Sequence, residues 1–337
     1  MAEVVALSGA FPTATRARRY AVTVAVLCVL AVAVAAGILL WDNPAPTGSD
    51  GFWRIAQLRV TSVIVIAIVA VCQGIATITF QTVTANRIVT PSIMGFESLY
   101  TAISTAAIFF LGAAGALLVQ GPGPYLLQIA AMLAFSGALY GWLLSGRYAN
   151  VQIMLLVGII LGGALAAFST FLQRLLTPTE FDLLTARLIG SVANADATYL
   201  PIALPLAVTA GGLLAFGGGR LNLLGLGREV ALSLGSSQRR DSILALLLVS
   251  VLMAVSTSLI GPMTFFGFLV AMLTYQLADT FDHRRMFALS GLVGFVVLGG
   301  AYVVLKHVFY AAGSVGIIVE IVGGTLFLIH LLRKGRL

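Results

Sequence analysis

Long apolar runs recur along the whole chain, and their length decides what it can fold into. About ten of them approach the 20 residues that a helix needs to cross the hydrocarbon core of a bilayer. Only 9% of the 337 residues are charged and 60% are hydrophobic, whereas soluble domains carry about 25% charged residues. The sequence therefore predicts an all-α polytopic membrane protein with about ten transmembrane helices.

The expected spans are separated by charged or turn-rich breaks, and nine or eleven spans are neighbouring interpretations. The third span starts at Pro91, where a broken or re-entrant turn is an alternative, and the eighth starts just after Gly261-Pro262. Together they predict one transmembrane domain over 20–332, with tails at 1–19 and 333–337. The spans are placed at 20–41, 58–82, 91–113, 125–145, 151–174, 198–217, 242–261, 264–280, 286–308 and 314–332.

Basic residues in the short loops predict the orientation, because Lys and Arg are retained on the cytoplasmic side. An even number of spans puts both termini in the cytoplasm and Asp42, Asp50, Glu180, Asp182 and Asp196 outside. The net charge of +7 then reflects topology and contact with anionic lipid, with no nucleic-acid partner expected. The cytoplasmic basic residues are Arg16, Arg18, Arg19, Arg87, Arg147, those of 220–240, His283 to Arg285, Arg333, Lys334 and Arg336.

Several kinds of chemistry lack their motifs in this sequence. It has no Gly-x-x-x-x-Gly-Lys-Ser/Thr for a nucleotide phosphate, no His-Glu-x-x-His and no Gly-x-Ser-x-Gly. Cys28 and Cys72 have no metal or disulfide spacing and are interpreted as small apolar packing residues. The first apolar run is too long for the core of a signal peptide, so we expect a retained span. We predict no catalytic residue, metal or cofactor, and energy supplied by an ion gradient or by another polypeptide.

One charged segment stands out between the sixth and seventh spans. Glycines at 227 and 235 suit the ends of a short helix, and Leu226, Val230 and Leu234 fall four apart, giving an apolar stripe on one helix face. An ordinary basic loop would also satisfy the rule for cytoplasmic charges. The sequence predicts a short helix over 227–235 that lies on a surface, within a cytoplasmic segment at 220–241.

Four sequence blocks resemble the permeases of iron-siderophore uptake ABC transporters, collinearly from about Leu58 to the C-terminus. RLNLLGLGREVALSLG at 220–235, followed by Arg239-Arg240, resembles the coupling segment of that family. LLVGIILG at 155–162 with LIGS at 188–191 resembles its fifth span and the following external turn. GPMTFFGF at 261–268 resembles its Gly-Pro-Ile-x-Phe-x-Gly-Leu block. FQTVTANR at 80–87 with TPSIMG at 90–95 resembles its second to third span.

The resemblance implies the type II importer fold, which cobalamin and haem importers share. It implies a second permease subunit, identical or related, two ATP-binding subunits that hydrolyse ATP on separate chains, and an extracytoplasmic siderophore-binding protein. The chain would sit in a bacterial plasma membrane and translocate a ferric siderophore without altering it. Most members continue the Gly-Pro block with Pro-His and then Arg, but this chain has Ala271-Met272 and Tyr275. That departure resembles the branch that handles ferric catecholates, and haem or cobalamin remain alternative cargoes.

The resemblance assigns the charged segment to coupling with the ATPase. Arg228 and Glu229 would orient the helix by charge-assisted bonds, and Ala231 would allow close approach. The predicted coupling residues are Gly227, Arg228, Glu229, Val230, Ala231, Leu232, Leu234, Gly235, Arg239 and Arg240.

Arg54, Arg59 and Lys306 fall on the outer side, against the positive-inside pattern. In the resembled family, outward basic residues at these places receive acidic groups of the binding protein. The alternative is interfacial snorkelling, in which a long basic side chain reaches the headgroups from the end of a span.

The turn formed by Asn86, Arg87 and Pro91 matches the inner constriction of the resembled family and is the candidate cytoplasmic gate. A plain turn is the alternative; in either case Pro91 restrains Thr90 toward an extended conformation.

Polar residues at membrane depth are the candidates for a translocation path: Ser169, Thr170, Gln173 and Glu320. Helix-to-helix hydrogen bonding explains them equally well. Glu97 and Glu320 each need a partner, water or a proton at membrane depth, where a charge costs about 2.5 to 3.5 kcal/mol.

The rival class is an ion-coupled secondary transporter, which would also have ten apolar spans and a few buried carboxylates such as Glu97 and Glu320. Pseudo-symmetry between spans two to five and seven to ten does not separate the two classes. Dependence on a partner ATPase does.

Overall fold

The computed structural model describes residues 9–118, 121–145, 150–189, 191–192, 195–235, 237–309 and 314–334, and over these ranges it is helical with no strand. Arg147, Gly190 and Arg336 lie outside the described residues, as do the side chains of Arg228, Arg333 and Lys334.

Ten long helices correspond one to one with the ten predicted runs. Seven helices of the described chain are long and apolar enough to span a membrane, and three shorter apolar helices cover Phe96–Gly112, Phe266–Ala278 and Val315–Ile329. The prediction of an all-α membrane fold is confirmed. The ten are α1 Ala14–Leu40, α2 Asp50–Val83, α3 Phe96–Leu118, α4 Pro122–Ser145, α5 Val151–Gln173, α7 Leu200–Phe216, α10 Gln238–Ile260, α11 Phe266–Ala278, α12 His283–His307 and α13 Val315–Lys334.

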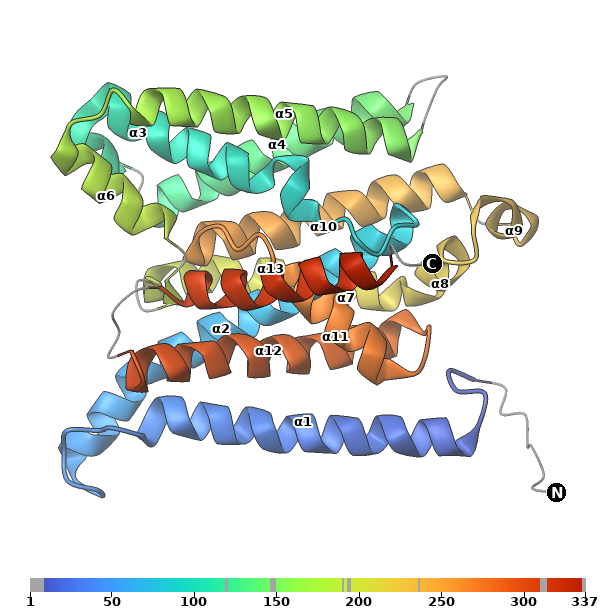
Figure 1. Cartoon of the computed structure of the whole chain (residues 1–337), viewed down its shortest axis with the longest axis horizontal. Coiled ribbons are helices and arrows are strands. Elements are labelled where there is room, and N and C mark those ends of the chain that lie inside the picture. The colour runs from blue at the N-terminus through green and yellow to red at the C-terminus, as the bar shows by residue number, and fades with distance from the viewer. Residues whose placement is uncertain are drawn as a thin grey trace.

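Short elements connect the long ones at both ends of the bundle. Figure 1 shows the long helices running roughly along the longest axis of the molecule, with α6 at one end and α8 and α9 at the other. The first turn of α1 and the last turn of α13 lie at the α8–α9 end. We refer below to the α6 end and the α8–α9 end. The short elements are η1 Pro91–Met94, α6 Pro178–Leu188, η3 Ala197–Tyr199, α8 Gly218–Leu224 and α9 Arg228–Ser233.

The first two long helices begin earlier than hydropathy predicts, because capping residues set their starts. The Thr13 hydroxyl accepts a hydrogen bond from the Arg16 amide, so α1 begins at Ala14. The Ser49 hydroxyl accepts from the Phe52 amide at 3.2 Å, and α2 therefore begins at Asp50. A hydropathy pattern registers only the apolar part of a helix, whereas a cap registers its first turn.

The helices α2 and α10 form the centre of the bundle and α1 lies on its outside. The most apolar windows of α2 and α10 are 78% and 72% buried, and that of α1 is 11% buried. Apolar residues of α1 that no other helix covers, such as Val29 and Val32, are exposed on the side where lipid would surround the bundle. Cys72 of α2 is buried and packs as expected, but Cys28 of α1 is exposed.

The predicted third span is interrupted at its start, as the alternative reading of Pro91 allowed. Pro91 opens the 3-10 helix η1, and Gly95 then takes a φ of 95°, after which α3 begins at Phe96. A Cβ atom on Gly95 would lie 3.1 Å from the Cα atom of Gly162 in α5. Glycine is required here both by the positive φ and by the contact between two backbones.

Candidate functional site

The charged segment forms the short helix that its glycines predict. Helix α9 covers Arg228–Ser233, Gly227 has a φ of 93° and Gly235 has a φ of 80°. Before it, α8 continues directly from α7 through Gly217. Two short helices therefore project from the end of the bundle where α7 finishes and α10 begins.

The residue that anchors α9 is Ala231, which corrects the role expected for it. Ala231 is completely buried within this chain, so it does not offer a surface to a partner. Leu226 and Leu234 are 58% exposed and Val230 is 48% exposed. Leu226 lies before Gly227, so the three residues do not form the single helix stripe that the sequence predicts. Their exposed side chains are the part of this segment that another protein could cover.

A cavity of about 370 Å³ lies between α8, α9 and the start of α10. Leu223, Leu234 and Arg240 line it. Arg239 and Arg240 are both exposed in the first turn of α10. Three of the predicted coupling residues, Leu234, Gly235 and Arg240, thus line a cavity at the α8–α9 end.

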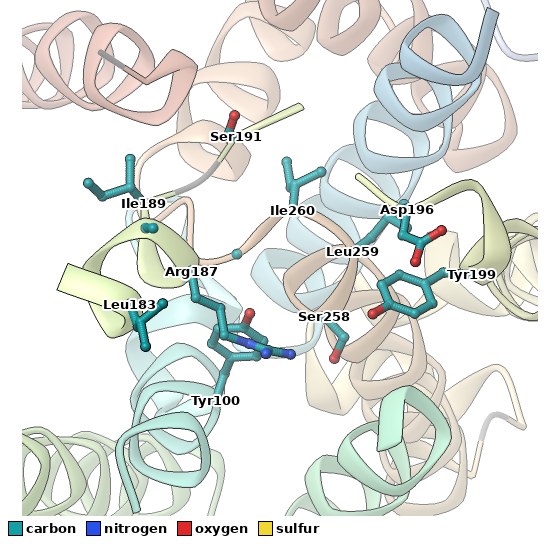
Figure 2. A pocket seen from close by; sticks show the side chains of 12 residues that line it. Tyr100, Leu183, Arg187, Ile189, Ser191, Asp196, Tyr199, Ser258, Leu259 and Ile260 are labelled. Carbon is teal, nitrogen blue, oxygen red and sulfur yellow. The ribbon is translucent and has the colours of Figure 1, made fainter. Parts of the chain in front are cut away.

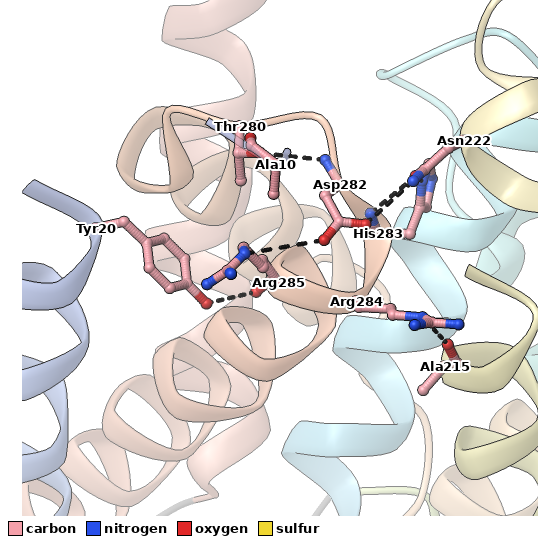
Figure 3. A network of polar contacts seen from close by, with 9 residues as sticks. All are labelled: Ala10, Tyr20, Ala215, Asn222, Thr280, Asp282, His283, Arg284 and Arg285. Atoms are coloured by element: carbon pink, nitrogen blue, oxygen red, sulfur yellow. Dashed lines mark hydrogen bonds and ion pairs between the residues drawn. The ribbon is translucent and has the colours of Figure 1, made fainter. Parts of the chain in front are cut away.

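One histidine joins α8 to the end of α2. The Nδ1 atom of His283 lies 2.6 Å from Oδ1 of Asn222 in α8, and the His283 amide donates to the same oxygen at 3.0 Å. Its Nε2 atom lies 2.7 Å from the Thr82 hydroxyl of α2. The Asn222 amide group also donates to Asp282 at 3.1 Å. Figure 3 shows the His283–Asn222 and Arg285–Asp282 contacts within one polar network.

The same turn also holds the first helix. The Tyr20 hydroxyl donates to the Arg285 carbonyl at 3.0 Å (Figure 3), and the Arg285 guanidinium lies 4.8 Å from the Phe11 ring centroid. Arg16 forms an ion pair with Asp279 at 3.5 Å. The loop between α11 and α12 is therefore a junction where α1, α2 and α8 meet.

The candidate gate is an ordered turn between α2 and η1. The Gln81 amide donates to the Arg87 carbonyl at 2.8 Å, and the Asn86 side chain accepts from the Ile88 amide at 2.9 Å. The Arg87 guanidinium lies 4.7 Å from the centroid of the Tyr275 ring in α11, a cation–π contact. Thr90 is extended with a ψ of 155°, as Pro91 requires. Tyr275, which replaces the family's Arg, thus contacts the gate turn.

Thr264 lies between the two carboxylates found at membrane depth. The Thr264 hydroxyl donates to Glu97 at 2.6 Å and the Met263 amide donates to Glu97 at 3.1 Å. The backbone of Thr264 also forms a hydrogen bond with Glu320. These donors come from the Gly-Pro break between α10 and α11, where backbone amides lack helical partners. The break therefore supplies the partners that Glu97 and Glu320 need.

The four candidate path residues do not all face one open surface. Ser169 is buried and its hydroxyl donates to the carbonyl of Leu165, whereas Thr170 is exposed. The Gln173 amide lies 3.4 Å from the Thr105 hydroxyl of α3. Glu320 is half-buried on α13. All four have a partner, since the Thr170 hydroxyl donates to the Ala166 carbonyl at 2.9 Å and Glu320 bonds to Thr264. Exposure, rather than a missing partner, makes Thr170 the most accessible of the four candidates.

Arg59 has a structural role that the sequence did not reveal. Its guanidinium donates to the carbonyls of Trp41 at 2.7 Å and Asp42 at 3.0 Å, and lies 3.4 Å from that of Ile38. These carbonyls belong to the last turn of α1 and the residues after it, which have no helical donor. Arg59 therefore caps α1 at the α6 end.

The other two predicted docking residues differ in exposure. Arg54 is exposed on the first turns of α2, and Lys306 is half-buried in the last turn of α12. Lys306 is attracted by Asp42 and repelled by Arg59. Beside it, the rings of Trp41 and His307 stack with centroids 4.7 Å apart. All three basic residues thus lie where α1, α2 and α12 meet at the α6 end.

A pocket of about 400 Å³ opens at the α6 end between α3, α6, η3 and α10. Figure 2 shows Arg187 of α6 beside Tyr100, with Asp196 and Tyr199 across the pocket. Arg187 donates a hydrogen bond to the Tyr100 hydroxyl, and the Tyr199 ring stacks on Tyr125 at 4.6 Å. Four separate elements line the pocket, so no local motif could have predicted it.

The structure also identifies residues that the sequence did not predict. Asn222 lies inside the block at 220–235, but nothing in that block distinguishes it from its apolar neighbours. The sequence predicts His283 only as one of the basic residues on the cytoplasmic side. The sequence signal that could have indicated it is the polar run Asp282-His283-Arg284-Arg285. This run follows the eighth predicted span and is expected on the same side of the membrane as the predicted coupling segment.

The arrangement of the helices and polar groups defines the class of protein. It is a multi-pass membrane protein whose polar groups gather at the two bundle ends and at one helix break, with no group of metal-ligating residues among those described. The model of the FecCD transport family matches residues 20–334. This chain belongs to the FecCD transport family.

Two individual relatives are similar to this chain over most of its length. It is 45% identical over 327 residues to the petrobactin import system permease protein FatC of Bacillus anthracis, covering 97% of this chain and 92% of that one. It is 24% identical over 287 residues to FatD, a second petrobactin import system permease protein of the same organism, covering 85% and 83%.

A solved ABC transporter of metal-chelate type, in an inward-facing conformation, has the same fold. The TM-score is 0.77 at 22% identity, covering 93% of this chain and 99% of that chain. The family and the fold together make this chain a permease subunit of a membrane transporter.

Proposed function

We propose that this chain imports a ferric siderophore as one permease subunit of an ATP-driven transporter. The observation that carries the proposal is the 45% identity to FatC over 97% of the chain, since a likeness of that extent includes every span and every connection. The substrate class follows from the relatives, because both FatC and FatD are petrobactin import permeases. Ferric petrobactin is therefore the first cargo to test, in agreement with the catecholate branch that Ala271-Met272 resembles.

The energy source would dock at the α8–α9 end. The sequence has no P-loop motif of its own. Val230 on α9 and Leu226 and Leu234 on either side of it are exposed apolar residues. A short amphipathic helix presenting such residues suits a groove of an ATP-binding subunit. The contacts of His283 with Asn222 and Thr82 would carry a movement of α8 to α2, which leads into the gate turn.

A second permease would cover the exposed faces of α5 and α13. Phe168 and Phe171 on α5 and Ile321 on α13 are 47%, 60% and 64% exposed. Thr170 and Glu320 lie on the same two helices. A path between two permeases would thus bring polar groups of both subunits together. Because the relatives include two distinct petrobactin permeases in one organism, we propose a related partner subunit rather than a second copy.

The orientation follows from the distribution of charge. The α8–α9 end has Arg87, Arg220, Arg240 and Arg284, so we place it, together with both termini, on the cytoplasmic side of a bacterial plasma membrane. An extracytoplasmic binding protein would then meet the α6 end. Of the three basic residues predicted to receive the binding protein, Arg54 and Lys306 do not cap α1.

Uptake into liposomes tests this function. The chain is reconstituted with its candidate partner permease and ATPase, and accumulation of radioactive iron as ferric petrobactin is measured with the binding protein outside. We expect uptake that requires ATP inside and survives dissipation of ion gradients. Uptake that persists without the ATPase and stops when the gradients are dissipated would instead establish the ion-coupled secondary transporter. Competition by haem or cobalamin would reassign the cargo while leaving the mechanism in place.

A further inference from the structure

Two apolar grooves flank the last three turns of α7. The first groove has a volume of about 620 Å³ and lies between α7, α8 and α10, where Leu213, Phe216 and Leu244 line it. The second has a volume of about 560 Å³ and lies between α2, α7 and α12, where Val208 and Ala288 line it. Phe216 and Val208 are 83% and 62% exposed, so both grooves open to the surroundings of the bundle.

Arg284 lies at the mouth of both grooves. It lines each of them, and its guanidinium donates to the carbonyls of Ala215 and Phe216 at 3.2 Å. Figure 3 shows it reaching from α12 to the end of α7. Its stem packs on Gly218, where a Cβ atom would lie 2.8 Å from the Arg284 Cγ atom. A guanidinium has five N–H donors, so this fixed group has donors left for an anion.

A second cation stands beside the first groove. Arg220 lines this groove, its side chain is 71% exposed, and it lies 3.4 Å from the Asp241 carboxylate. Arg240 lines the adjoining cavity. The acidic residue at the mouth is Asp241, so the local charge of Arg220, Arg284 and Asp241 is positive at neutral pH.

We propose that a two-chain anionic phospholipid binds astride the end of α7, with one acyl chain in each groove and its phosphate between Arg284 and Arg220. The occupant follows from three features: the apolar grooves run along membrane-spanning helices, they are separated by a single helix, and they share one arginine at the bundle end. A bilayer supplies acyl chains at that depth and phosphates at that level. A second copy of the chain would need one continuous surface, which α7 divides.

The proposal goes beyond the transport function and does not rest on it. The lipid would join α7 to α8 and α12 at the base of the segment proposed to couple ATPase movement, without contacting the cargo. Its test therefore measures lipid binding alone and gives the same answer whether or not ferric petrobactin is the substrate.

The experiment uses the purified full chain in nanodiscs of phosphatidylcholine containing a minor share of phosphatidylglycerol. Native mass spectrometry after release from the disc counts the phospholipid retained by each chain. We expect preferential retention of phosphatidylglycerol, with about fivefold weaker binding in Arg220→Gln and again in Arg284→Gln. Arg284→Lys should recover most of the affinity. The matched control is Arg174→Gln, an exposed arginine at the end of α5, which should leave phosphatidylglycerol retention unchanged.

A second variant tests the two-chain geometry while leaving all charges in place. Ala288→Phe fills the second groove and should weaken phosphatidylglycerol binding but not that of single-chain lysophosphatidylglycerol. Thermal unfolding of each variant verifies that the bundle is intact. Equal retention of phosphatidylcholine and phosphatidylglycerol, or retention unchanged in both arginine variants, overturns the proposal. So does a dimer of this chain that Ala288→Phe dissociates, since the grooves would then be an interface between copies.

Discussion

At the scale of single residues, the structure changes what Arg59 means. A lone arginine on the outer side of a membrane protein invites a docking role, but here its guanidinium is engaged by carbonyls at the end of α1. Such bonds are charge-assisted and geometrically fixed, so they position the arginine as well as the helix. Arg54, five residues earlier and exposed, has the freedom that docking requires.

Exchanging these two arginines for glutamine should separate the roles. Arg59→Gln removes the guanidinium from the Trp41 and Asp42 carbonyls and should cost about 2 kcal/mol, seen as a lower Tm in detergent. Arg54→Gln should leave Tm unchanged and weaken binding-protein association, most strongly at low salt. An unchanged Tm in Arg59→Gln, together with weaker association, would restore Arg59 as a docking residue.

At the scale of elements, α9 corrects the apolar stripe that the sequence predicts. Leu226, Val230 and Leu234 would share one face only on a continuous helix, but α9 covers Arg228–Ser233 and Leu226 lies before Gly227, whose φ is 93°. The three side chains are exposed all the same, whereas Ala231 is completely buried within the chain.

Two aspartate substitutions in α9 should therefore differ in kind. Leu234→Asp changes an exposed side chain and should alter stability by less than about 0.5 kcal/mol, while abolishing ATP hydrolysis stimulated by the loaded binding protein. Ala231→Asp buries an unpaired carboxylate and should destabilise the protein by roughly 3 kcal/mol or more. Thermal unfolding and ATPase assays measure the two effects. Stimulated hydrolysis that survives Leu234→Asp would remove α9 from the coupling surface.

The stability of helix α6, which lies outside the membrane-spanning helices, is expected to depend on pH. The Glu180 carboxylate accepts from the Thr177 amide at 3.0 Å and from the Thr177 hydroxyl at 2.8 Å, forming a capping box. These bonds hold the pKa of Glu180 below its ordinary value. Because the folded pKa is the lower one, the stabilisation is present above the unfolded pKa of about 4.3 and is lost as pH falls through the folded value.

Hydrogen exchange of the α6 amides measures that dependence after correction for intrinsic rates. Protection should fall toward acid pH in the unmodified chain. In Glu180→Gln, whose side chain does not titrate, the protection should be nearly independent of pH below about pH 5, where carboxylates begin to bind protons. Equal acid profiles in the two proteins would show that the capping box does not set the stability of α6.

At the scale of the whole molecule, burial separates the helices that make the bundle from those that face outward. Helices α2 and α10 lie at the centre, and Gly95 and Gly162 bring the α3 start against α5. The large apolar side chains of α5 remain exposed all the same. A helix that packs against the bundle on one face and is exposed on the other is suited to contact with a second permease.

Paired alanine variants test whether α5 and α13 form that interface. Phe171→Ala with Ile321→Ala removes two large exposed side chains and should weaken association with the partner permease roughly tenfold. Val29→Ala with Val32→Ala, on the exposed face of α1, is the matched control and should leave association unchanged. Co-purification through a tag on the partner measures both. Equal loss in the two double variants would place the interface elsewhere.

Most of the fold could be predicted because each membrane span is determined by the residues of one contiguous segment. Each run from Tyr20 onward carries its own apolar length, and the breaks at Pro91 and at Gly261-Pro262 carry their own turn chemistry. The resemblance indicated the candidate coupling block and the candidate gate turn for the same reason, since each is a contiguous segment. What a contiguous segment does not contain is the identity of its neighbours.

The tertiary structure alone decided which side chains meet. Thr264 meets Glu97 across 167 positions, and His283 meets Thr82 across 201. No periodicity predicts these pairs, because they depend on how helices pack once they are inside the membrane. The sequence by itself determined the spans, their breaks and the exposed charge; packing determined that Arg59 caps a helix, that Ala231 is an anchor and that Arg284 stands over two grooves. The physical reason is that hydrophobic length is a property of one segment, whereas a hydrogen bond needs two.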